Sequence, residues 1–71
     1  MSTVGENLLK ALKLKYEANI EAAKATLTIY TTNSVGIGEH PQHLEEMDKL
    51  VDQIASNEDK LSAITSHFTI S

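Results

Sequence analysis

The nine residues VGIGEHPQH, at positions 35–43, separate two stretches with helical periodicity and decide how the chain folds. Gly36 and Gly38 permit backbone conformations that other residues resist. Pro41 has a fixed φ angle and no amide hydrogen, so it suits the first position of a helix. The segment therefore predicts a connection over residues 33–40, followed at once by a helix.

Apolar residues recur with near-heptad spacing on both sides of this connection, which is typical of helices that pack along one face. Thr3 and Glu6 form the Thr-x-x-Glu pattern of a capping box. The first apolar stripe consists of Leu9, Leu12, Tyr16, Ile20, Ala23, Leu27 and Tyr30, and the second of Leu44, Met47, Leu50, Val51, Ile54, Leu61, Ile64 and Phe68. We therefore predict helices over about residues 4–32 and 41–67.

Residues 26–32, TLTIYTT, allow a second interpretation. β-Branched residues alternate there with period two, which on its own is typical of a strand. The heptad stripe nevertheless continues through the segment to Tyr30, so we favour a helix that ends near Thr32.

A short connection between two helices most simply returns the chain antiparallel. If Thr32 lies opposite Pro41, the two apolar stripes meet along most of their length, and Leu9 faces Ile64. The predicted fold is all-α: a single domain over residues 1–71 that forms an antiparallel two-helix hairpin (helix-loop-helix). In the same register Leu12 faces Leu61.

Two asparagines interrupt the apolar stripes. Asn19 and Asn57 occupy positions where Leu or Ile is expected, about three residues apart along the helix axis, or roughly 4.5 Å. Their amides can bond to each other, or Asn57 can bond to the Tyr16 hydroxyl. We interpret the pair as one that fixes the register or the oligomeric state. A small polar ligand site and solvent-facing amides are the alternatives.

Leu8, Leu14 and Ile29 lie outside the stripes that pack within the chain. A chain of 71 residues without cysteine has no disulfide to stabilise it, and two helices enclose little core. We therefore predict a homo-oligomer in which hairpins assemble into a helical bundle and cover these residues. Scattered exposed leucines, which are normal, are the alternative.

Charge and hydropathy exclude some functions. The net charge is −4, with four lysines against three glutamates in residues 1–35 and two lysines against seven acidic residues in 36–71. Because arginine is absent and no dense basic face is present, nucleic-acid binding is not expected. No apolar run approaches the roughly 18 residues of a membrane span, and the N-terminus lacks a secretory pattern. We expect neither membrane insertion nor secretion.

The connection itself could bind an anion. Gly36 and Gly38 lead into a helix N-terminus, where the free amides of Gln42 and His43 attract negative charge. Glu39 opposes such a ligand, and no lysine follows as in a nucleotide phosphate loop. A tight helix-to-helix connection is the favoured interpretation. A basic pocket could also form between subunits from Lys10, Lys13, Lys15 or Lys24 with Tyr16 or Tyr30, of which Lys13 and Tyr16 are the chosen candidates.

Metal binding and catalysis have weaker signals. His40, His43 and Glu46 could share an ion, but the first helix offers no further ligand nearby, so we predict no metal or other cofactor. Ser66 and His67 are adjacent in sequence, which does not make a catalytic dyad. We predict that the chain is not an enzyme.

The segment NSVGIGEHPQHLEEMDKLVDQIASNEDKL (33–61), with an N-terminal helix of the type LLKALKLKYEANIEAAKA (8–25), resembles small uncharacterised proteins of tailed bacteriophages, notably those of marine and cyanobacterial hosts. The resemblance covers nearly the whole chain, and the GIGEHP turn is its most distinctive part. It implies a viral origin and a role in the host cytoplasm or in the virion, and it transfers no functional residue.

Two functions fit these observations. The first is a non-enzymatic assembly or interaction module that self-associates and binds a host or viral protein through its acidic second helix. The second is an oligomeric small-ligand binder that sequesters a nucleotide signal of host anti-phage defence, by analogy with other short helical phage proteins. The candidate ligand residues are Lys13, Tyr16, Gly36, Gly38, Gln42 and His43.

Overall fold

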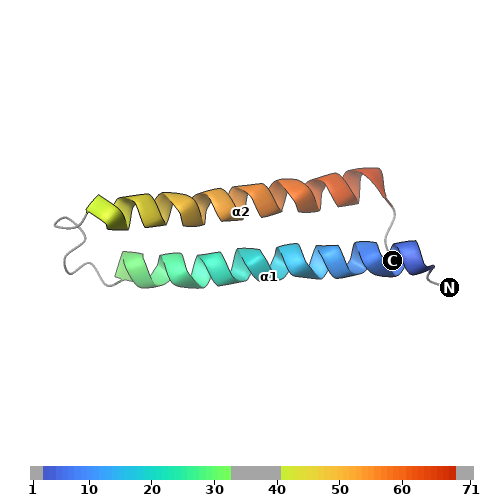
Figure 1. Ribbon diagram of the computed structural model, residues 1–71, viewed down its shortest axis with the longest axis horizontal. Coiled ribbons are helices and arrows are strands. Elements are labelled where there is room, and N and C mark those ends of the chain that lie inside the picture. The colour runs from blue at the N-terminus through green and yellow to red at the C-terminus, as the bar shows by residue number, and fades with distance from the viewer. Residues whose placement is uncertain (1–2, 33–40, 69–71) are drawn as a thin grey trace.

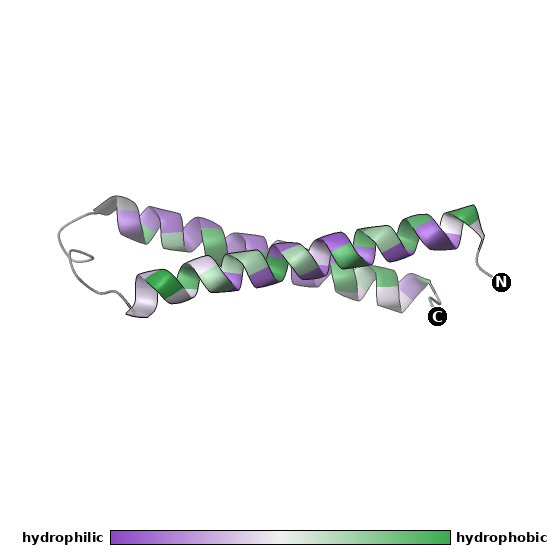
Figure 2. Ribbon diagram, turned by 90° about the horizontal axis from the view of Figure 1, so that it is seen from below, coloured by the Kyte–Doolittle hydropathy of each residue, from purple (hydrophilic) through white to green (hydrophobic). Residues whose placement is uncertain are grey.

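A computed structural model describes residues 3–32 and 41–68, and these residues form two α-helices, α1 (Val4–Thr32) and α2 (Pro41–His67). The helices lie side by side and antiparallel (Figure 1), and in Figure 2 they cross at a shallow angle. The molecule is a thin rod with principal extents of 54 × 16 × 13 Å. The predicted all-α helical hairpin is confirmed, with helices over the predicted ranges.

The N-terminus of α1 is capped by half of the predicted capping box. The backbone amide of Glu6 donates to the Thr3 hydroxyl oxygen at 3.1 Å, as the pattern requires. The Glu6 carboxylate, however, accepts from the Thr3 hydroxyl at 3.5 Å rather than from the Thr3 amide. The amide of Asn7 donates to the Thr3 carbonyl at 3.0 Å and closes the first turn. Thr3 is therefore the residue on which the start of the helix depends.

Residues 26–32 are helical, so the strand interpretation does not hold. Their threonines satisfy their hydroxyls within the helix: Thr26 donates to the Ala22 carbonyl at 3.0 Å, and Thr28 donates to the Lys24 carbonyl at 2.8 Å. Thr32 makes the same kind of bond to the Thr28 carbonyl at 2.8 Å. This bonding to a carbonyl one turn earlier lets β-branched residues remain in a helix that packing already favours.

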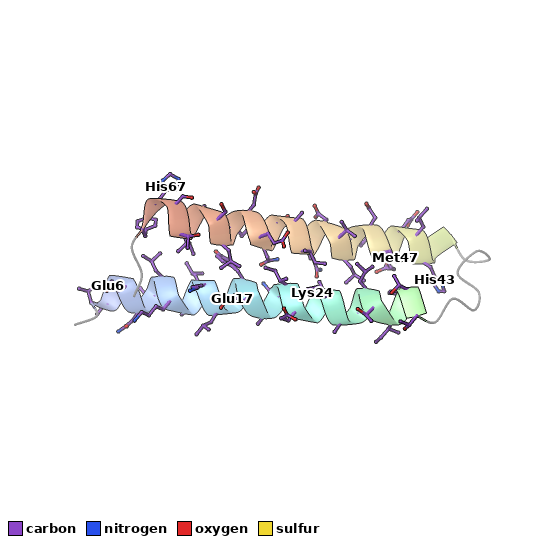
Figure 3. All side chains as sticks on the ribbon, turned by 180° about the vertical axis from the view of Figure 1, so that it is seen from behind. Glu6, Glu17, Lys24, His43, Met47 and His67 are labelled. Carbon is purple, nitrogen blue, oxygen red and sulfur yellow. The ribbon has the colours of Figure 1, made fainter. Side chains whose placement is uncertain are left out.

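The two helices pack along one seam, by which we mean the line of residues on each helix that faces the other. Apart from Glu6 and Lys10 near the start of α1, the buried and half-buried residues are spaced alternately three and four apart, namely Leu9, Lys13, Tyr16, Ile20, Ala23, Leu27 and Tyr30 on α1 and His43, Met47, Leu50, Ile54, Asn57, Leu61 and Ile64 on α2. Only Ala23, Asn57 and Ile64 among the described residues are buried. The core is thus a single layer of side chains, visible between the ribbons in Figure 3.

The seam corrects part of the predicted stripes. Lys13, not Leu12, occupies the seam of α1, and Leu12 lies at its edge with 39% exposure. The predicted stripe of α2 also includes Leu44, Val51 and Phe68, but these residues are more than half exposed. The physical reason is that a seam needs alternating steps of three and four residues, and a lysine can line it with its aliphatic stem while its ammonium group stays in water.

The register agrees with the prediction at the connection end. Placing Thr32 opposite Pro41 also places Tyr30 opposite His43, and the rings of these two residues lie 5.5 Å apart between centroids.

Neither of the two described helices has the length and hydropathy of a membrane-spanning segment.

Candidate functional site

The most distinctive polar feature of the hairpin is an amide pair near the middle of the seam. The Nδ2 atom of Asn19 donates to Oδ1 of Asn57 at 3.0 Å, so of the two bonds that the sequence allows for Asn57, the one between the asparagines is present. The Nδ2 atom of Asn57 donates to the backbone carbonyl of Gln53 at 2.6 Å. Asn57 is only 6% exposed, and both ends of its amide have a partner inside the chain.

The two asparagines differ in position, which corrects the sequence interpretation. Asn57 lies in the seam as predicted, whereas Asn19 is exposed and reaches in from the flank. The seam residues of α1 nearest to it are Tyr16 and Ile20, so position 19 is one step out of the heptad pattern. The exposed amide can return to water if its partner is lost, but the buried one cannot.

The amide pair is sensitive to register. Sliding α2 by one heptad against α1 would carry Asn57 about 10 Å along the axis, far beyond hydrogen-bond reach of Asn19. Its buried oxygen would then lie among apolar neighbours, which costs free energy. The pair can therefore select one alignment of the helices, and amides by themselves supply no nucleophile, acid or base.

Tyr16 has a partner that the sequence interpretation missed. The Nζ atom of Lys60 lies 5.5 Å from the centroid of the Tyr16 ring, within the range of a cation–π contact. The register could have revealed this pair, because Lys60 follows Asn57 by one turn, and Asn57 levels with Tyr16. The apolar and amide patterns on which the sequence interpretation rests do not single out a lysine.

The candidate ligand residues do not form one site. Lys13 and Tyr16 are half-buried near the middle of α1, while His43 lies at the connection end of α2 on the side that faces α1 (Figure 3). Because His43 contacts Tyr30, the separation along the axis from Tyr16 is about 20 Å. Gly36, Gly38 and the side chain of Gln42 lie outside the described residues.

The described part of the chain contains no pocket and no group of three metal-ligating side chains. His40, one member of the metal interpretation, lies outside the described ranges. His43 instead packs its ring against Tyr30 with an interplanar angle of 57°. We interpret this tilted aromatic contact as a structural one that joins the two helix ends nearest the connection.

The predicted oligomer residues are exposed within one chain, as the prediction requires. Leu8, Leu14 and Ile29 keep 62%, 66% and 63% of their surface, respectively. They are joined by Val4 at 77% on α1 and by Leu44 at 72% on α2. The hairpin thus leaves large apolar side chains uncovered on both helices, and it carries more of them outside the seam than it buries within it.

In comparisons with known proteins, no family model, no curated protein and no solved structure matches the chain.

Proposed function

We propose that this chain is a non-enzymatic, self-associating assembly or interaction module. The observation that carries the proposal is its exposed surface. A folded monomer of 7.8 kDa is expected to expose about 4,400 Å², whereas this chain exposes 5348 Å². The difference, about 1,000 Å², is close to the roughly 800 Å² that each partner buries in a standard protein interface.

The apolar residues support the same conclusion. Fully burying one large aliphatic side chain contributes about 1.5–3 kcal/mol. Ala23 and Ile64 are the only buried apolar residues among those described, so little of this free energy is available within one hairpin. Covering Leu8, Leu14 and Ile29 in an oligomer would at least double the number of well-buried large side chains, and it would stabilise a fold that is marginal alone.

The partner of the assembled module is proposed from charge. Glu45, Asp52 and Asp59 repeat at heptad spacing along the exposed side of α2 and give that side a strong negative charge. We propose that this acidic side binds a basic surface of a host or viral protein. The phage setting rests on the resemblance of the GIGEHP segment and its flanking helices alone.

The test of self-association is the mass of the particle in solution. Sedimentation equilibrium at micromolar concentration is expected to give at least twice the chain mass of 7.8 kDa. The melting temperature is expected to rise with protein concentration, because association stabilises the folded state by mass action. A monomer that melts cooperatively and at one temperature over about a hundredfold range of concentration would refute the proposal.

One observation favours the second candidate function, the binding of a nucleotide. Lys60 and the ring of Tyr16 are in contact, and Lys13 is half-buried one turn before Tyr16. Lysines beside an aromatic ring combine the charge that binds phosphate with a surface on which a base stacks. A nucleotide at about 100 times its Kd should stabilise the chain by about 2.7 kcal/mol. A thermal-shift screen in which no nucleotide raises the melting temperature would exclude this function.

A further inference from the structure

Three of the exposed large apolar residues of α1, Val4, Leu8 and Ile29, lie on the side opposite the seam, whereas Leu12 and Leu14 lie between that side and the seam. From Val4 to Thr32, the residues spaced alternately four and three apart form a line along α1, and all of them are exposed. We call this line the outer stripe of α1. Its large members are Val4, Leu8 and Ile29, the residues between them are mostly alanines, and Lys15 is its only charged residue.

The corresponding side of α2 has a different character. Glu45, Asp52 and Asp59 repeat there every seven residues. In Figure 2 the part of α2 near the connection is largely hydrophilic, while apolar bands continue along the whole of α1. If two copies paired through their α2 helices, like charges would come together. If α1 of one copy packed on this side of α2 of the other, carboxylates would lose their hydration against alanine side chains. Contact between two α1 helices avoids both costs.

We propose that two copies of this chain pair through the outer stripes of their α1 helices, antiparallel, about a twofold axis at Ala18. The inference rests on the self-association proposed above and names its face and orientation. Ala18 is the midpoint between Val4 and Thr32, so this pairing overlaps the helices over their full length. The overlap, about 42 Å long, is consistent with an interface that uses the surplus surface of roughly 1,000 Å² per chain.

The antiparallel orientation follows from the residues that become level with each other. Leu8 of one copy lies near Ile29 of the other at both ends of the stripe, and Ala11 lies near Ala25. Lys15 of one copy comes level with Glu21 of the other. In a parallel pair, Lys15 of one copy would lie level with Lys15 of the other, so like charges would face each other. The two acidic α2 helices would then also run in the same direction and at the same level.

The pairing also separates the acidic helices. Because the outer stripe lies opposite the seam, the four helices stand in one layer in the order α2, α1, α1, α2. The charged sides of α2 then lie at the two outer edges, as far apart as this assembly allows, and both remain accessible to a partner.

Cysteine cross-linking tests the orientation, because the full sequence contains no cysteine and any disulfide must form through the introduced residues. Under mild oxidation the Ala18→Cys variant is expected to form a covalent dimer, because the axis brings this position against its own copy. Ala11→Cys is expected to cross-link with Ala25→Cys in a mixture, and neither should do so alone. Ala55→Cys, an exposed alanine on α2, is the matched control.

Two outcomes overturn the inference. If Ala18→Cys cross-links no faster than Ala55→Cys, the face is wrong. If Ala11→Cys cross-links with itself as fast as with Ala25→Cys, the orientation is wrong. Both readouts depend on proximity, so they remain decisive for any variant whose circular dichroism shows the helical content of the parent chain.

Charge substitution separates this inference from the proposed function. Ala18→Glu is expected to raise the dissociation constant of the dimer on the order of 100-fold or more, because two carboxylates would be buried at the axis. Ala55→Glu adds the same charge on α2 and is expected to change it less than about threefold. An unchanged dimer of Ala18→Glu would refute this face but leave self-association standing, while a monomeric parent chain would refute self-association itself.

Discussion

The amide pair makes an unusual prediction for an exposed residue: Asn19→Ala should destabilise the hairpin. Replacing an exposed Asn by Ala within a helix normally stabilises it by up to about 0.7 kcal/mol, because Ala has the higher helix propensity. Here the substitution removes the donor to Oδ1 of Asn57, which is 6% exposed. A buried acceptor without a partner costs about 1–3 kcal/mol. The net loss is therefore expected to be about 1–2 kcal/mol.

A double-mutant cycle assigns this loss to the bond. In an Asn57→Leu background the buried acceptor no longer exists, so Asn19→Ala should be neutral or slightly stabilising. The free energies of unfolding would be measured by urea denaturation with circular dichroism, at one protein concentration for all variants. Asn7→Ala, an exposed Asn on the same helix, is the control and should not destabilise. Equal effects of Asn19→Ala in the two backgrounds would show that the bond contributes nothing.

Three further variants test single features. Asn57→Leu should raise the melting temperature by roughly 4–8 °C, because the gain from burying an apolar side chain should exceed the loss of the hydrogen bonds by about 1 kcal/mol. The variant should also broaden the distribution of oligomers in sedimentation, and no change in either measurement would exclude a register role. Thr3→Ala should cost about 1 kcal/mol in urea unfolding through loss of the cap, whereas Thr65→Ala, at an exposed site within α2, should cost less than about 0.5 kcal/mol. Lys60→Gln should cost no more than about 1 kcal/mol by removing the contact with Tyr16, and a loss above that in thermal unfolding would mean that Lys60 has a larger role.

The helices could be predicted from sequence because several independent signals agree. Thr3 caps the first helix, Pro41 begins the second, and the near-heptad spacing continues between these limits. The same spacing outweighed the β-branched alternation of residues 26–32. The bond between Asn19 and Asn57 was predictable for a related reason, since an antiparallel register fixes which residues are level along the whole seam.

Other features could not be predicted by these means. Hydropathy ranks Leu12 above Lys13, yet the geometry of the seam selects the lysine, because its stem is apolar and its charge can reach water. The cation–π contact of Tyr16 joins residue types that a search for apolar pairs ignores. Chemical type identifies the candidate ligand residues, but type alone cannot show that Lys13 and His43 lie about 25 Å apart along the rod. The predictions for Gly36 and Gly38 concern residues outside the described ranges and stay predictions.

The single-layer seam has a consequence for how such a sequence can change over generations. Each seam residue contacts only near neighbours, on the facing helix and one turn away on its own helix, so substitutions more than about 7–10 Å apart should affect stability independently. Most positions can therefore drift one at a time without a compensating change elsewhere, and similarity between descendants would fade quickly. The positions of Asn19 and Asn57 are the exception. An insertion or deletion of seven residues between this pair and the connection keeps the bond only when both helices change by the same length. The lengths of related hairpins should therefore differ in matched steps of seven residues per helix.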